Sequence, residues 1–213
     1  TYRSLRMLRV PYVISGSGKT VPEDTGTYPK SALVTTDTEI ESQSMVDYLC
    51  SCGHKRIAFI TSGDEGLGRC HLNGYKRSLE KNGLEYDEKL IIRLKPGKRI
   101  YTIENGYNCT CELLKSGVDF SCIYAISDTL AVGACRAIID SGKRVPEDYC
   151  VAGADGQDIA EYYHPSITTL KYPRVETAQQ SVRTLFDLID RKKVVKRQIL
   201  CGTLIEREST RKL

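Results

Sequence analysis

The stretch "CIYAISDTLAVGACRAIIDSGKRVPEDYCVAGAD", from Cys122 to Asp155, decides the fold. It begins with a short apolar run, continues with a helical pattern over residues 129–141 that Asp128 precedes, and closes on a second apolar run over residues 149–154. Short apolar runs joined by a helix are typical of parallel strands with a crossover connection. The stretch therefore predicts a strand–helix–strand unit in which Asp128 caps the helix.

The same alternation continues on both sides of this unit. Apolar runs predict further strands at residues 10–15, 31–36, 56–61, 89–94 and 198–207, and periodic segments predict helices at 39–52, around 72–79, at 103–115 and at 174–191. Strands that alternate with helices favour an α/β fold, in which helices cover both faces of a parallel sheet.

Length and composition exclude several classes of protein. The 213 residues, 40% of them hydrophobic, suffice for one large or two small domains with a real core. A net charge of +4 is too weak to mark a nucleic-acid surface by itself. No apolar run reaches the roughly 18 residues that a membrane helix needs.

Nine cysteines, most of them inside apolar segments, favour a reducing compartment, so we expect a cytoplasmic protein. Because the chain does not begin with Met, we interpret it as a fragment or a processed product.

Polar side chains follow several of the predicted strands. Asp37, Thr61, Ser127 and Asp155 each stand at or just beyond a strand end. Ligands of open α/β sheets bind outside the carboxyl ends of the strands, and a carboxylate accepts hydrogen bonds from ligand hydroxyls. The pattern predicts a crevice for a hydroxyl-bearing ligand. Asp followed by Gly is also a common turn, so a purely turn-forming Asp155 stays open, as does an Asp37 that only begins a helix.

Three other motifs lack the context that their chemistry needs. "SGSGKT", residues 15–20, resembles the end of a phosphate-binding loop, but the first glycine of that motif falls on Val13 and no helical pattern follows. "CSCGH" (50–54) and "RCH" (69–71) lack the ligand spacing of structural zinc sites. No nucleophile, base and orienting group can be named together. We therefore expect no metal, no cofactor and no catalytic residue.

From Asp37 to Thr210 the sequence resembles the lactose-repressor family of bacterial transcription regulators. The resemblance rests on "YLCSCGHKRIAFI", "HLNGYKRSLEKNGL", the long stretch that begins "AISDTLAVGACRAIIDSGKRVPED", and "GTLIERESTRKL", in this order and spacing. It implies a two-lobed, periplasmic-binding-protein-like α/β fold with parallel sheets flanked by helices.

The resemblance also implies a domain organisation. We expect a first lobe, incomplete here, at residues 1–52 and 172–200, and a second lobe at residues 53–171 and 201–213. The helix-turn-helix head with which members of the family bind DNA is absent from this chain.

Three ligand-binding residues are implied by the same resemblance. The acidic effector ligand of the family falls on Asp155, and the Asp that opens a helix of the first lobe falls on Asp37. The aromatic residue that stacks on the effector falls on Tyr101.

Two further positions depart from the family pattern. The effector-binding Arg of the family is His71 here, with Arg69 two residues earlier, and its Asn before the helix-opening Asp is Ser127. An imidazole that faced the crevice would change its charge near pH 6.5, so ligand affinity would vary between about pH 5.5 and 8.

The resemblance implies that this chain is the effector-binding and dimerisation core of a transcription regulator, which we expect in the cytoplasm. Its partners would be a small polar effector, such as a sugar or polyol bound between the lobes, and a second copy of the chain, with no membrane contact. Operator DNA would be bound only through the missing head. The alternative is an exported or transporter-linked sugar-binding protein, and an enzyme is the least favoured class.

Overall fold

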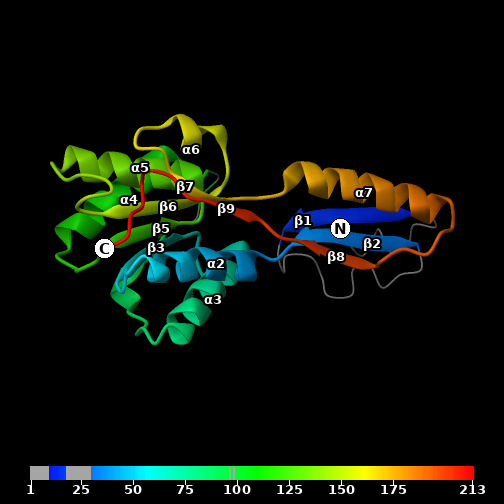
Figure 1. Ribbon diagram of the computed structural model, residues 1–213, viewed down its shortest axis with the longest axis horizontal. Coiled ribbons are helices and arrows are strands. Elements are labelled where there is room, and N and C mark those ends of the chain that lie inside the picture. The colour runs from blue at the N-terminus through cyan, green and yellow to red at the C-terminus, as the bar shows by residue number, and fades with distance from the viewer. Residues whose placement is uncertain (1–9, 18–29, 96, 98) are drawn as a thin grey trace. The chain divides into compact units, whose positions relative to one another are not determined.

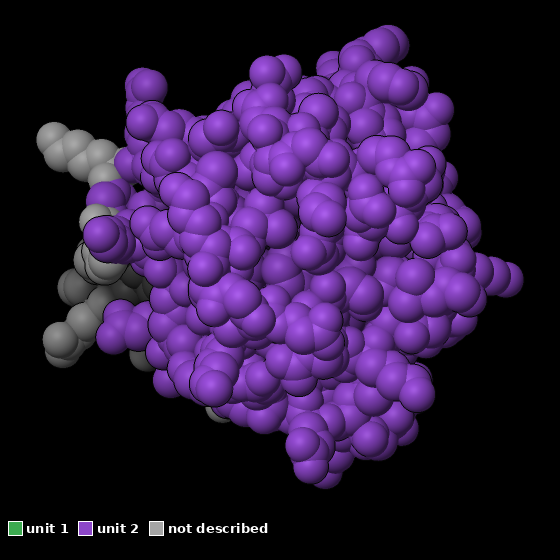
Figure 2. Space-filling view, turned by 90° about the vertical axis from the view of Figure 1, so that its left-hand side faces the viewer, with its two compact units in different colours: residues 1–38, 172–202 green, residues 39–171, 203–213 purple. Residues whose placement is uncertain are grey.

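The computed structural model describes residues 10–17, 30–95, 97 and 99–213 of the chain, which folds into two compact units (Figure 1). Unit 1 contains residues 1–38 and 172–202, and unit 2 contains residues 39–171 and 203–213, the part shown in purple in Figure 2. The units divide after Thr38, whereas the sequence analysis places the division after residue 52.

Unit 1 is built on a three-stranded parallel sheet. Its elements are β1 (Tyr12–Ser17), β2 (Ser31–Thr36), β8 (Arg197–Leu200) and helix α7 (Arg174–Ile189), with strand order β1-β2-β8. Helix α7 packs along β1 and β2, and the central strand β2 is buried along its whole length. Ser15, Gly16 and Ser17 of the "SGSGKT" motif belong to β1, and residues 18–20 lie outside the described part of the chain.

Unit 2 is built on a six-stranded sheet of order β4-β3-β5-β6-β7-β9. The strands are β3 (Ile57–Thr61), β4 (Ile91–Arg93), β5 (Cys122–Ala125), β6 (Cys150–Asp155), β7 (Thr168–Lys171) and β9 (Thr203–Ile205). Every neighbouring pair is parallel except β7 and β9, which run antiparallel. The predicted α/β fold with mainly parallel sheets is therefore confirmed.

Helices cover both faces of this sheet, as parallel crossovers require. They are α2 (Thr38–Ser51), α3 (Gly66–Lys81), α4 (Ile103–Lys115), α5 (Asp128–Asp140) and the short α6 (Asp158–Tyr162), with a 3-10 turn, η2, at Glu88–Leu90. Figure 1 shows α2 and α3 on one face and α4 and α5 on the other. None of the helices in the described part of the chain is long and apolar enough to cross a membrane.

Helix α2 belongs to unit 2 because its partners lie there. The Asp47 carboxylate accepts hydrogen bonds from Ser78 and Lys81 of α3, and the Tyr48 hydroxyl pairs with Thr210 at 3.0 Å. Ser42 donates a hydrogen bond to a main-chain carbonyl of α3. These contacts tie residues 39–52 to unit 2 and account for the observed division.

The single last strand predicted at residues 198–207 is wrong. The segment forms two strands in different sheets, β8 in unit 1 and β9 in unit 2, separated by Cys201 and Gly202. Gly202 interrupts the apolar residues at this point, but the sequence pattern does not show that the chain passes from one sheet to another there. Helix α6 and strand β7 are likewise not predicted by the sequence pattern.

Two glycines allow α4 and α5 to pack closely. A side chain built on Gly106 would stand 2.2 Å from the Leu130 carbonyl oxygen, and one on Gly133 would stand 2.1 Å from the Ile103 carbonyl oxygen. Both distances are far below any real contact, so the main chains touch directly. This contact fixes the N-terminal ends of α4 and α5 beside each other.

Candidate functional site

The carboxyl edge of the unit 2 sheet carries two of the residues that the sequence predicts as ligand contacts, Asp155 and Ser127. Strand β6 ends at Asp155, and β5 leads through Ile126 to Ser127 at the start of α5. Because β5 and β6 are neighbouring parallel strands, their carboxyl ends lie side by side. Polar groups from two strand ends thus meet at one edge of unit 2.

Asp155 occupies a strained turn at the end of β6. Its φ of 105° lies in the left-handed region, which non-glycine residues rarely adopt, and Gly156 follows with a φ of 65°. The half-buried carboxylate accepts a hydrogen bond from Gln157 Nε2 at 2.8 Å. Backbone strain at a non-glycine residue points to a functional constraint, because the surrounding structure must offset its cost.

Ser127, and not Asp128, caps helix α5. The Ser127 hydroxyl accepts a hydrogen bond from the Leu130 amide at 3.3 Å, whereas Asp128 is the first residue of the helix. The predicted capping role of Asp128 is therefore wrong. A serine hydroxyl serves an N-cap as well as an aspartate does, which leaves the next residue available for contacts away from its own helix.

The Asp128 carboxylate instead connects helix α5 to the turn after β6 and to strand β7. It is fully buried, and its two oxygens accept hydrogen bonds from the Thr169 hydroxyl and from the Gln157 amide, each at 2.6 Å. Burial raises the pKa of Asp128 to about 6, against the lowering effect of these two hydrogen bonds. Gln157 and Thr169, which no sequence pattern singles out, are therefore bonded to the candidate site.

Tyr101 lies beside the N-terminus of α5. The Thr129 hydroxyl donates to the Tyr101 carbonyl oxygen at 3.2 Å and pairs with the Ser127 hydroxyl at 3.1 Å. The Tyr101 side chain is exposed, at 45% of its full area, as a ring that stacks on a ligand would need to be. Through these contacts and the Asp128–Gln157 pair, unit 2 brings Tyr101, Ser127 and Asp155 to one edge.

His71 lies in the second turn of α3, on the side that faces the sheet. It stands one turn before Tyr75, whose ring stacks on Phe59 of β3 at 4.9 Å between centroids. His71 is only 5% exposed, and its Nδ1 atom has no hydrogen-bond partner among the described residues. Burial lowers its pKa to about 4, so the imidazole is neutral between pH 5.5 and 8. A neutral imidazole disfavours the pH dependence of ligand affinity described above, which requires a His71 that faces the crevice.

Arg69 and His71 lie on different sides of helix α3. Successive residues of a helix are turned by about 100°, so positions two apart face nearly opposite ways. Arg69 is exposed, while His71 is buried. Asp37 is described in unit 1, where it follows β2 and directly precedes α2. A joint role of Asp37 with the residues of unit 2 stays a prediction.

Replacing His71 should reduce the acid sensitivity of the fold. The pKa of His71 is near 6.5 in the unfolded chain and about 4 in the folded chain, so the unfolded state binds more protons in this window. Stability is therefore lost as the pH falls from about 6.5 towards 4, by about 2–3 kcal/mol at pH 4.5. His71→Gln should recover most of that loss in urea denaturation at pH 7 and 4.5.

The matched control for this measurement is His164→Gln, because the His164 side chain is 90% exposed. The control should keep the acid sensitivity of the parent. Both variants retain Asp128 and the buried His54. The titration of these two residues therefore contributes equally to both variants and cancels in the comparison. An unchanged pH slope in His71→Gln would show that the folded protein leaves His71 free to ionise.

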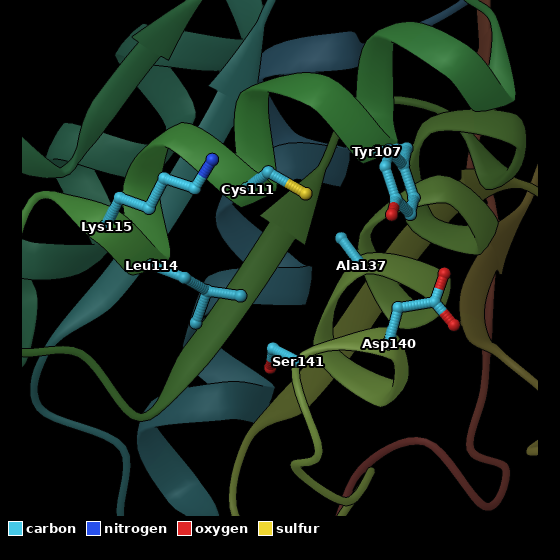
Figure 3. Close-up of a pocket in the computed structure, with 7 residues that line it drawn as sticks. All are labelled: Tyr107, Cys111, Leu114, Lys115, Ala137, Asp140 and Ser141. Atoms are coloured by element: carbon cyan, nitrogen blue, oxygen red, sulfur yellow. The ribbon is translucent and has the colours of Figure 1, made fainter.

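A pocket of about 210 Å³ lies elsewhere, between α4 and α5 (Figure 3). Its lining comprises Tyr107, Cys111, Leu114, Lys115, Ala137, Asp140 and Ser141. Crossover helices run antiparallel to their strands, so these later turns of α4 and α5 lie towards the amino ends of the strands. The pocket is therefore separate from the carboxyl edge that holds Asp155.

Metal chemistry and disulfides do not explain the site. Within the described ranges, no three His, Cys, Asp or Glu side chains are grouped as a metal ion would need. All nine cysteines are free thiols. Burial raises the pKa of Cys122 and of Cys135, which keeps both thiols protonated.

Comparison with known proteins gives a consistent result. Residues 46–210 match the family model of the periplasmic binding protein-like domain. The HTH-type transcriptional regulator MalR of Clostridium butyricum is 41% identical over 146 residues, which are 68% of this chain and 42% of that protein. The chain spans about half the length of the curated relatives it matches, with 50% for the regulator CelR of Thermobifida fusca.

Solved structures agree with the sequence match. The Escherichia coli transcriptional repressor ascG superposes with a TM-score of 0.83 and 27% identity, over 99% of this chain and 73% of that one. A complex of the transcriptional regulator CelR with cellobiose superposes with a TM-score of 0.79 and 32% identity, over 94% of this chain and 59% of that one.

Proposed function

The chain belongs to the periplasmic binding protein-like domain family, in the group of lactose-repressor-type regulators, and we propose that it is the effector-binding core of a bacterial transcription regulator. The effector is a small polar molecule, in the first place a sugar. The relatives are named as transcriptional regulators, and one neighbour is solved with cellobiose, which supports both parts of the proposal.

The observation that carries the proposal is the turn at Asp155. A strained carboxylate stands at the carboxyl end of β6, next to Gln157, and the Ser127 hydroxyl lies just beyond the end of the neighbouring strand β5. The exposed Tyr101 is linked to Ser127 through the Thr129 hydroxyl. Carboxylate and amide groups bind sugar hydroxyls, and an aromatic ring packs on the apolar face of a sugar.

The remaining functions of the intact regulator follow from its relatives. We place operator binding in a helix-turn-helix domain outside the 213 residues of this chain, since the curated relatives are named HTH-type and are about twice as long. A homodimer suits a palindromic operator, and a DNA-binding regulator works in the cytoplasm. Effector binding then changes DNA affinity, because the effector binds two conformational states of the core with different affinities.

The runner-up is an exported or transporter-linked sugar-binding protein of the same fold. Nine free thiols favour the regulator, because secreted proteins usually pair their cysteines. An enzyme is disfavoured because the relatives that match are named as transcriptional regulators.

A thermal-shift panel of sugars, nucleosides and amino acids tests the proposal. A ligand at a hundred times its Kd should stabilise the fold by about 2.7 kcal/mol, which raises the melting temperature of a chain of this size by several degrees. We expect at least one sugar to give that shift without turnover of the sugar. Shifts confined to amino acids, or consumption of the sugar during incubation, would contradict the assignment.

A further inference from the structure

We infer that Asp128 is the positioning residue that holds Asp155 in its ligand-binding conformation. The inference rests on the proposed function, because it concerns the same effector site. The inference gives a role to the buried carboxylate of Asp128, which caps no helix. Effector binding then requires Asp128, although this residue does not touch the effector.

The hydrogen bonds around the turn after Asp155 form one connected network. The main-chain amide of Gln157 donates to one carboxylate oxygen of Asp128 at 2.6 Å. The Thr169 hydroxyl donates to the other oxygen, also at 2.6 Å. The same Thr169 oxygen accepts a hydrogen bond from the Gly156 amide at 3.3 Å. The two amides that follow Asp155 are thus fixed, one by Asp128 directly and the other through Thr169.

This arrangement holds a conformation that Asp155 would not keep by itself. A positive φ at a non-glycine residue is unfavourable and persists only where its surroundings impose it. Once the amides of Gly156 and Gln157 are fixed, the Gln157 side chain can reach back to the Asp155 carboxylate at 2.8 Å. Both the main chain and the side chain of Asp155 therefore depend on the Asp128 anchor.

Strand β6 is shaped to admit this anchor. A side chain built on Gly153 would stand 2.4 Å from an oxygen of Asp128, so the carboxylate rests directly against the main chain of the strand. Asp128 and Thr169 are both fully buried. Burying a carboxylate is unfavourable unless its oxygens are hydrogen-bonded, and here each oxygen has a donor from the β6–α6 turn or from β7.

A double-mutant cycle separates positioning from a general structural role. The variants are Asp128→Ala, Asp155→Asn and their combination, titrated with cellobiose or, if cellobiose gives no thermal shift, with the sugar of the panel that shifts most. Asp128→Ala should weaken binding about tenfold or more, and the double variant should bind no worse than Asp155→Asn alone, because residues that act through one another are not additive. Losses that multiply in the double variant would overturn the inference.

Two further variants guard against simple unfolding. Asp128→Asn keeps the size, can still accept from the Gln157 amide and can donate to the Thr169 hydroxyl, so it should stay within about threefold of the parent affinity. Asp47→Ala removes an aspartate that ties α2 to α3, and it should lower stability with no change in sugar affinity. A loss of affinity in Asp47→Ala as large as that in Asp128→Ala would assign both effects to stability alone.

Amide exchange gives a measurement that needs no effector. In Asp128→Ala the amides of Gly156 and Gln157 should exchange faster than in the parent, while those of strand β5 keep their protection. Unchanged exchange at these two amides would overturn the positioning role even if no sugar is found. Failure of the whole panel would contradict the proposed function and leave this result to decide the inference separately.

Discussion

Asp155→Asn should weaken sugar binding by ten- to more than a hundredfold while the protein stays folded. The substitution keeps the size of the side chain and its contact with Gln157 but removes the negative charge. A hydrogen bond to a charged group contributes about 1.5–3 kcal/mol, and about 1.4 kcal/mol corresponds to a factor of ten in Kd. Calorimetric titration of the two proteins with the same sugar measures the difference.

Asp158→Asn is the matched control for this prediction. Asp158 lies three residues further on, is exposed and begins α6, so it shares the charge and the neighbourhood of Asp155 but not its place at the strand end. The control should bind sugar as the parent does. Equal affinity in all three proteins would reduce Asp155 to a turn-forming residue.

Gly133→Ala should destabilise the protein by about 3 kcal/mol, through overpacking against α4. The added methyl group would stand 2.1 Å from the Ile103 carbonyl oxygen, which belongs to the main chain and can move only with its helix. Helix propensity alone favours Ala over Gly by about 1 kcal/mol, so a net loss shows that the steric term is larger. For a chain of this length the melting temperature should fall by roughly 6–12 °C.

Asn108→Ala provides the comparison for that measurement, since Asn108 is exposed on α4. It should leave the melting temperature unchanged or raise it slightly, because Ala is the better helix former. A Gly133→Ala protein as stable as the parent would mean that α4 and α5 can separate at little cost, and that the close contact does not fix their N-terminal ends.

Local patterns were sufficient to predict most of the fold. The strand predicted at 31–36 and the helix predicted at 103–115 have those bounds in the structure, because a short apolar run and a capped periodic segment are complete signals in themselves. Helix α6 has five residues, which are too few to show a helical period. Strand β7 begins with two threonines, which are polar but are buried because neighbouring elements cover them. The division between β8 and β9 falls at Gly202, and that the two strands join different sheets depends on tertiary structure that the sequence pattern does not reveal.

The strand-end positions of Asp155 and Ser127 were predictable from the sequence, whereas the contacts of the residues around them were not. Asp155 and Ser127 stand at strand ends, which a βα pattern locates directly. The roles of Asp128 and Gln157 depend on the contact between β6, β7 and α5, which no local sequence pattern specifies. The neutral state of His71 depends on burial, and the sequence gives only the residue type and its ordinary pKa.

A crystal structure of this chain with a sugar from the panel tests the central claim most directly. We expect a sugar hydroxyl to donate to the Asp155 carboxylate at about 2.5–3.0 Å, with the sugar ring against Tyr101. A sugar bound in the pocket between α4 and α5, with no hydrogen bond to Asp155, would contradict the assignment of the effector site.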